Sequence, residues 1–129
     1  MTHLLNALAQ ATGVELAPAA SRTSTLTGTG IDVLEYEGVA LVLLNASAGT
    51  GTSPTLDVKL QHSDDDSTYE DVTSGTFSQV TDAAETAGVK VMKLNVSDLK
   101  RYLRIVGTIA GTTPSFDFGV EFVGITKAG

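Results

Sequence analysis

Apolar and polar positions alternate along most of the chain from about residue 31 onward. Residues 56–61 alternate without interruption, and residues 116–122 place three phenylalanines and a valine on one side, with Asp, Gly and Glu on the other. Successive side chains of a strand point to opposite faces, so both segments predict half-buried strands. Residues 39–44 are continuously apolar, which predicts a central strand covered on both faces.

Shorter strands are predicted between turns rich in Gly, Ser, Thr and Asp, at residues 31–36, 69–72, 77–80, 89–96 and 102–109. No segment after Gly30 has sustained helical periodicity, and residues 97–100 predict a single turn. About eight short strands in roughly 100 residues are typical of a two-sheet β-sandwich. We therefore expect an all-β fold, a β-sandwich of jelly-roll type formed by residues 31–129. Its expected core comprises Val42, Leu44, Leu56, Val58, Leu60, Val91, Leu103, Ile105, Phe116, Phe118 and Val120.

Residues 1–30 differ from the rest and are expected to form an extended N-terminal arm. Residues 4–11 predict two turns of an apolar helical face, ended by Gly13. Residues 18–30 are expected to be extended or flexible. Two interpretations remain open, a loose tail and an arm that becomes ordered only against a partner. The arm residues expected to contact a partner are Leu4, Leu5, Leu8, Leu16 and Leu26.

One octapeptide pattern occurs twice. Residues 51–58 read Gly-Thr-Ser-Pro-Thr-Leu-Asp-Val and residues 111–118 read Gly-Thr-Thr-Pro-Ser-Phe-Asp-Phe. Each copy follows an apolar strand and continues as an alternating one. Proline fixes φ and cannot donate a ladder hydrogen bond, so each proline is expected just before a strand. Two such strand–turn–strand units agree with the predicted sandwich.

Composition and charge exclude several classes of function. The 129 residues include no cysteine, which excludes thiol catalysis, disulfides and cysteine-based zinc sites. The net charge is −7, which disfavours binding to nucleic acid or to an anionic membrane. No apolar run is long enough to cross a bilayer, and no signal peptide is apparent, so synthesis in a host cytoplasm is expected.

The side chains that could take part in catalysis or metal binding do not form a catalytic pattern, and neither an enzyme nor a cofactor is expected. His62 and Ser63 precede the acidic run Asp64–Asp66. Neighbouring strand residues point to opposite faces and cannot hydrogen-bond in series as a triad. The acidic run has two interpretations, a turn that caps its own backbone and a calcium site, and its spacing favours the turn.

Lys100, Arg101 and Arg104 form the main basic cluster of the chain. They are expected either to keep the surface soluble, with pairing to Asp98, or to contact an acidic partner.

Several strings resemble a family of small structural proteins of tailed bacteriophages. The resemblance extends from about Arg22 to Lys127, and it rests on turn-and-strand strings. These strings are Arg22-Thr23, residues 28–33, Tyr36-Glu37-Gly38, residues 49–61, residues 101–104 and residues 111–116.

The resemblance implies a virion component, specifically a capsid decoration or cement protein. Its partner would be the major capsid protein, on the exterior of the capsid, and its copies would form a homotrimer. Two other functions remain open, a tail or other virion component, and a carbohydrate-binding or adhesion module on the same sandwich.

Overall fold

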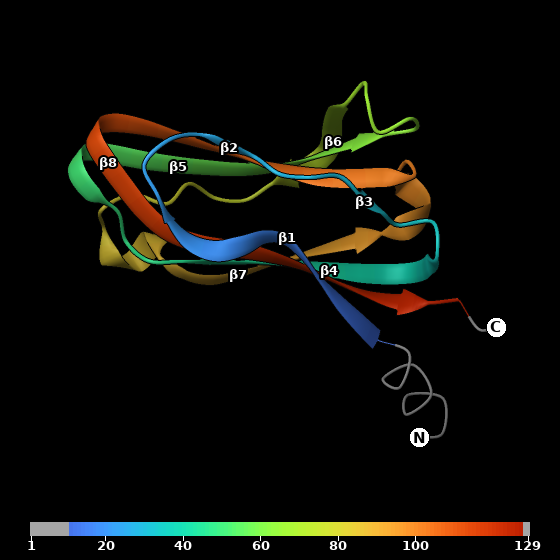
Figure 1. The fold of residues 1–129 in the computed structure, drawn as a ribbon. Coiled ribbons are helices and arrows are strands. Elements are labelled where there is room, and N and C mark those ends of the chain that lie inside the picture. Colours follow the sequence, from blue (N-terminus) through green and yellow to red (C-terminus); the bar gives the residue numbers. More distant parts are fainter. Residues whose placement is uncertain (1–10, 128–129) are drawn as a thin grey trace, which may run out of the picture.

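Strand β8, Tyr102–Thr126, runs through both layers of the fold. The computed structural model describes residues 11–127 of the chain. All strand pairs are antiparallel, and the strands that pair with β8 at its two ends belong to two different layers. Figure 1 shows the layers stacked on each other, with β8 turning from one into the other. This arrangement confirms the predicted all-β sandwich.

We call one layer sheet A. It contains β1 (Ala11–Arg22), the C-terminal half of β8, β4 (Tyr36–Ala46) and β7 (Gly88–Asn95). β8 lies between β1 and β4, and β7 pairs with the other side of β4. β4 is therefore an inner strand of the sheet, as its apolar sequence predicts, and β7 is an edge strand.

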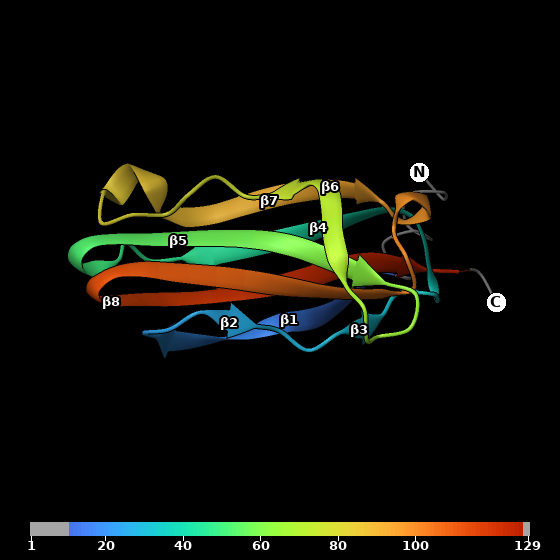
Figure 2. The same ribbon diagram turned by 90° about the horizontal axis from the view of Figure 1, so that it is seen from above.

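We call the other layer sheet B. It contains β5 (Thr50–Ser63), paired on one side with β6 (Glu70–Thr76) and on the other with the N-terminal half of β8. Two short strands, β2 (Leu26–Thr27) and β3 (Ile31–Asp32), follow the far side of β8. The view in Figure 2 shows β1, β2 and β3 along one side of the sandwich and β7 along the other.

Single helical turns complete the fold. The first, η1 (Ala84–Thr86), precedes β7. The second, η2 (Val96–Asp98), follows β7 and corresponds to the single turn predicted at this point. Residues 77–80 do not form the predicted strand, and they are joined to β5 by an isolated bridge between Val80 and Leu56 and by a hydrogen bond from the Phe77 N–H to the Val58 carbonyl.

The core lies between the sheets and contains every predicted core residue except Val91, which is 59% exposed. β8 supplies the largest buried side chains because its Phe positions alternate towards the other layer. Those fully buried side chains are Phe116, Phe118, Phe122, Leu44, Leu56, Leu60, Leu103, Ile105, Val33, Val42, Val58 and Val80.

The expected arm is wrong for residues 11–30, which belong to the sandwich. β1 pairs with β8 from Ala11 to Arg22, so the helix predicted to end at Gly13 gives way to a strand there. Leu16 and Ala17 are buried in the core. Pairing with a strand about 100 residues away along the chain overrides the local helical spacing, as tertiary contacts commonly do. Residues 1–10 of the expected arm lie outside the described residues.

Candidate docking face

The outer face of sheet A carries exposed apolar side chains. Residues 39–44 were predicted to be covered on both faces, and this prediction is wrong. Alternate residues of β4 are buried, but Val39 is 46% exposed and Leu41 is 36% exposed. On β7 the neighbouring side chains Val89 and Val91 are 62% and 59% exposed. Exposed apolar side chains that gather on one face are characteristic of interaction surfaces.

The strand register places this surface in three rows across sheet A, from β1 over β8 and β4 to β7. The middle row pairs Glu15 with Glu121, Glu121 with Leu43, and Leu43 with Val91. The two rows on either side are Gly13–Val123–Leu41–Lys93 and Gly119–Asn45–Val89. Residues opposite each other in adjacent strands share a face. The face is therefore acidic on the β1 and β8 side and apolar on the β4 and β7 side.

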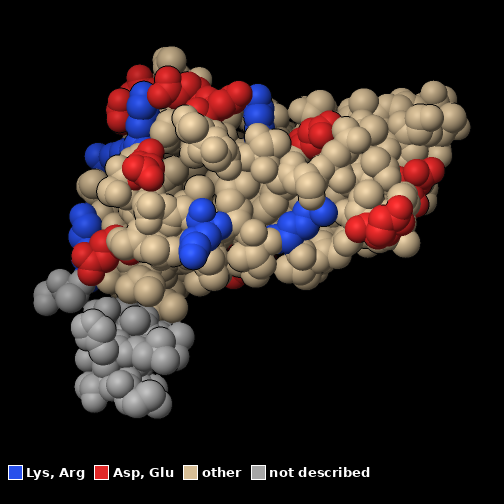
Figure 3. All heavy atoms as spheres, turned by 180° about the vertical axis from the view of Figure 1, so that it is seen from behind, with Lys and Arg blue, Asp and Glu red and all other residues tan. Residues whose placement is uncertain are grey.

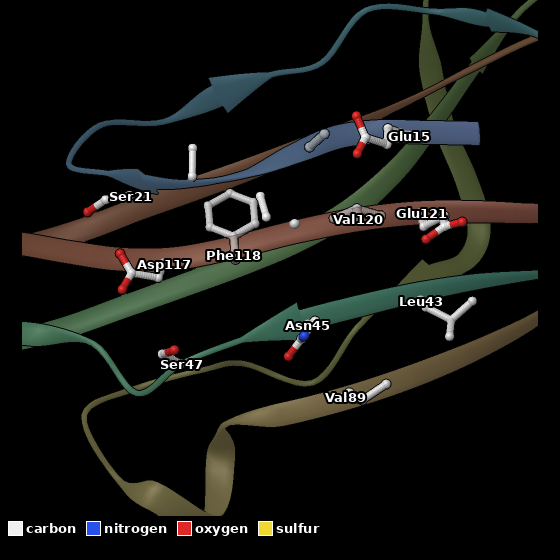
Figure 4. Close-up of a pocket in the computed structure, with 14 residues that line it drawn as sticks. Glu15, Ser21, Leu43, Asn45, Ser47, Val89, Asp117, Phe118, Val120 and Glu121 are labelled. Carbon is white, nitrogen blue, oxygen red and sulfur yellow. The ribbon is translucent and has the colours of Figure 1, made fainter. Parts of the chain in front are cut away.

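A groove of about 530 Å³ crosses the same face. Its lining runs from Glu15 and Ser21 on β1, across Asp117 and Glu121 on β8, to Val89 on β7 (Figure 4). At its centre β8 contributes a glycine, Gly119, above which the backbone of Ala19 lies. A Cβ at position 119 would come within 3.0 Å of the Ala19 Cα. The missing side chain thus lets β1 approach β8 closely and hollows the face.

The carboxylates of this face have no cationic partner within residues 11–127. None of the ion pairs or hydrogen bonds of these residues involves the side chains of Glu15, Asp117 or Glu121. Glu15 and Glu121 stand directly opposite each other in an antiparallel pair, where like charges are destabilising. The acidic side of the face is therefore open to a cationic group from outside.

Two of the five leucines predicted to contact a partner pack against the core of the sandwich. Leu16 is 3% exposed, and Leu26 is partly buried against the same cluster. Leu16 therefore holds β1 to the sandwich and has almost no exposed surface, whereas the partner role of Leu26 stays a prediction. Leu4, Leu5 and Leu8 lie outside the described residues, so their partner role stays a prediction.

The His62 region is a structural corner. His62 is buried, and its Nδ1 accepts a hydrogen bond from the backbone N–H of Lys100 at 3.1 Å. Ser63 Oγ donates to Asp65 Oδ1 at 2.8 Å and makes no hydrogen bond with the histidine. Lys100 Nζ lies 2.7 Å from Glu70 Oε1. Serine and histidine are therefore held by different partners, and no nucleophile–base pair forms.

Asp65 organises the acidic turn through its carboxylate. Its Oδ1 accepts backbone N–H hydrogen bonds from Ser67 and Thr68 at 3.0 and 2.9 Å. The bond from Thr68, followed by that from Ser63, lowers the pKa of Asp65 to about 2. This is the capping role favoured by the sequence. Within residues 11–127 no group of three or more His, Asp or Glu side chains is arranged to hold a metal ion.

The basic cluster is engaged with side chains other than Asp98. Arg101 pairs with Asp32 at 2.8 Å, and this bond raises the pKa of Arg101 and lowers that of Asp32. Arg104 donates two hydrogen bonds to Gln61 and its guanidinium lies 3.8 Å above the ring of Tyr69. In Figure 3 acidic side chains gather at the top of the view with basic ones beside them, and the rest of this side is largely uncharged.

The tyrosines do not form a platform for sugar rings. Tyr36 is buried against Phe122, with ring centroids 5.0 Å apart. Tyr69 lies beneath Arg104, and Tyr102 lies beneath Arg101 at 5.2 Å. Burial, followed by a hydrogen bond to Asp66, raises the pKa of Tyr69 to about 12.

No helix within the described part of the chain is long and apolar enough to cross a membrane.

Sequence reasoning missed the docking face, although two signals for it were present. The continuous apolar run of β4 and the alternating valines of β7 both place more apolar residues than one buried face requires. Residues 39–44 were assigned to burial on both sides because no local feature shows whether a second layer covers a strand.

Comparisons with known proteins agree with the fold. A family model described as Bbp16 matches residues 7–120. The SPBc2 prophage-derived protein YomS has a similar structure, with 14% identity, a TM-score of 0.50, and coverage of 88% of this chain and 93% of that one. No curated protein sequence matches the chain.

Two larger proteins contain the same fold. The PBSX exported protein XepA matches with 18% identity and a TM-score of 0.55 over 92% of this chain and 38% of its own. VP2 of the infectious bursal disease virus subviral particle matches with 12% identity and a TM-score of 0.58 over 90% of this chain and 32% of its own. The chain thus spans only about a third of the length of each, and the similarity establishes a jelly-roll-like sandwich.

Proposed function

The chain belongs to the Bbp16 family, and from this membership and the docking face we propose that it is a virion structural protein that binds the outer surface of a phage capsid and cements neighbouring capsomers. The observation that carries the proposal is the outer face of sheet A, where exposed apolar side chains adjoin unpaired carboxylates. Such a face is suited to protein contact, since interfaces combine an apolar centre with a polar rim.

The chemistry of the described residues supports a binding role over an enzymatic one. The groove contains carboxylates, small side chains and aliphatic groups, and it lacks a nucleophile paired with a base. His62 and Ser63, the best catalytic candidates from sequence, are buried and bound to different partners. The net charge of −7 keeps the protein away from packaged DNA and suits a site on the exterior.

The leucine-rich segment before Ala11 is proposed to add a second contact. Leu4, Leu5 and Leu8 could bury apolar area on a neighbouring subunit or capsomer, next to the contact made by the sandwich. Weak contacts repeated over a capsid lattice strengthen one another through multivalency. The partner proposed for both contacts is the major capsid protein.

The test is co-sedimentation of the purified protein with undecorated heads, with purified tails as a parallel sample. We expect saturable binding to heads at a fixed number of copies per head and none to tails. Binding to tails alone would support the alternative, a tail component. A variant lacking residues 1–10 should bind heads more weakly while unfolding at the same temperature as the full chain.

The proposed homotrimer is tested separately by light scattering on a sizing column. A trimer has three times the 13.3 kDa mass of the chain. A trimer in solution would favour clamping of a threefold position on the lattice. A monomer would instead mean that copies meet only on the capsid.

A further inference from the structure

We infer that the outer face of sheet A recognises a polypeptide surface on which Lys or Arg side chains stand beside an aliphatic strip. The cations would lie over Glu15 and Glu121, and the aliphatic groups over Leu43 and Val91. The inference rests on the proposed function, in which this surface belongs to the capsid protein.

The acidic half of the face holds carboxylates that have no cationic partner within residues 11–127. Glu15 and Glu121 are exposed, face each other across β1 and β8, and make no ion pair within residues 11–127. Asp117, two outward positions from Glu121 along β8 with Gly119 between them, adds a third carboxylate to the groove. A guanidinium or ammonium group placed between them would replace repulsion by attraction, with charge-assisted hydrogen bonds.

The apolar half lies in the same row as the carboxylates. Leu43 pairs with Glu121 on one side and with Val91 on the other, and Val89 lies next to Val91 on the outward side of β7. A partner strand or helix that lies along this row would therefore contact carboxylates at one end and aliphatic side chains at the other. This order of charge and apolar surface specifies the chemistry of the partner.

Two other occupants of the face, residues 1–10 of the same chain and a second copy of the chain, do not supply the required cations. Residues 1–10 contain neither Lys nor Arg. A second copy of the chain would bring a net charge of −7, and within the three rows its face offers one cation, Lys93, at the end away from Glu15. Like-charge contact disfavours an assembly in which this face meets its own copy. A basic heterologous partner satisfies both halves of the face.

The electrostatic half is tested with the double variant Glu15→Gln/Glu121→Gln in the binding assay with undecorated heads. Its matched control is Asp82→Asn/Glu85→Gln, which removes two exposed carboxylates that lie outside the three rows and make no ion pair within residues 11–127. We expect at least tenfold weaker binding for the first variant and a change of less than twofold for the control. The first variant should also show a shallower decrease of affinity with added salt.

The apolar half is tested with Val89→Thr/Val91→Thr, which keeps side-chain shape and strand propensity while replacing exposed methyl groups by hydroxyls. We expect at least threefold weaker binding with an unchanged salt dependence. Melting temperatures of all variants should stay close to that of the wild type, because the altered side chains are exposed.

Several outcomes would overturn the inference. If the wild type does not bind heads, the proposed function fails and the inference fails with it. If the wild type binds and Glu15→Gln/Glu121→Gln binds equally well, the inference alone fails. A changed solution mass for that variant would assign the face to contact between copies. Loss of hydrogen-exchange protection at residues 41–43 after deletion of residues 1–10 would assign it to the chain's own N-terminal segment.

Discussion

Gly51 and Gly111 each pack against the turn that contains the other. A Cβ on Gly51 would lie 2.5 Å from the carbonyl oxygen of Thr113, and a Cβ on Gly111 would lie 2.8 Å from that of Ser53. Both glycines have positive φ, of 106° and 123°. The two copies of the sequence repeat are therefore neighbours in space, at the end of the sandwich where β8 passes from sheet B to sheet A.

Gly51→Ala and Gly111→Ala should each destabilise the fold by more than backbone strain alone. Gly88 provides the matched control, since its φ is 109° and nothing lies within 4 Å of an added Cβ. We expect Gly88→Ala to cost about 1–3 kcal/mol of unfolding free energy, the usual cost of such a conformation. Chemical denaturation should show a larger loss for the other two variants. Equal losses in all three would contradict the close packing of the turns.

Deletion of residues 1–22 should destroy cooperative unfolding, whereas deletion of residues 1–10 should preserve it. The longer deletion removes β1 with its buried Leu16 and Ala17, and it exposes the edge of β8. Deleting one buried leucine side chain already costs about 2–5 kcal/mol. Calorimetry of both truncated proteins checks this difference. A normal transition for the longer deletion would mean that β1 is dispensable.

Phe118→Ala should cost about 3–5 kcal/mol of unfolding free energy. Its ring is buried, lies 4.7 Å from the Arg22 guanidinium, and packs across the core against Gly107 of the other layer. Leu41→Ala, on the outward side of the same sheet, should change stability by about 0.5 kcal/mol or less. Urea denaturation of the two variants separates the buried face from the docking face, and similar losses would contradict that division.

The acidic turn should make stability fall as the pH drops below about 4. The folded-state pKa of Asp65 is lowered to about 2 from an ordinary value of 3.8. A lowered pKa means that the carboxylate stabilises the fold above the unfolded pKa, and that this contribution disappears as the pH falls through the folded pKa. Asp65→Asn should therefore lower the urea midpoint at pH 6, and the gap to the wild type should narrow at pH 2. A constant gap would exclude this role.

The sequence alone determined the all-β class, most strand positions and the inward side of β5 and β8. Alternation with period two is a local property, and residues 56–61 and 116–122 display it whatever they pair with. The separate hydrogen-bond partners of His62 and Ser63 could also be anticipated, because neighbouring strand residues point to opposite faces. The repeated Gly-Thr-x-Pro turns could be recognised in the sequence as well, but their contact with each other could not.

Only the tertiary structure decided which apolar side chains stay exposed and where the N-terminal strand belongs. Val42 and Val91 are equally apolar in sequence, yet one is buried between the sheets and the other faces outward. Leu16 lies in the segment predicted to be an arm, and it is buried because β1 pairs with the edge of β8. The row from Glu15 to Val91 joins four strands far apart in the sequence. Burial and strand pairing are set by long-range partners, so local pattern cannot specify them.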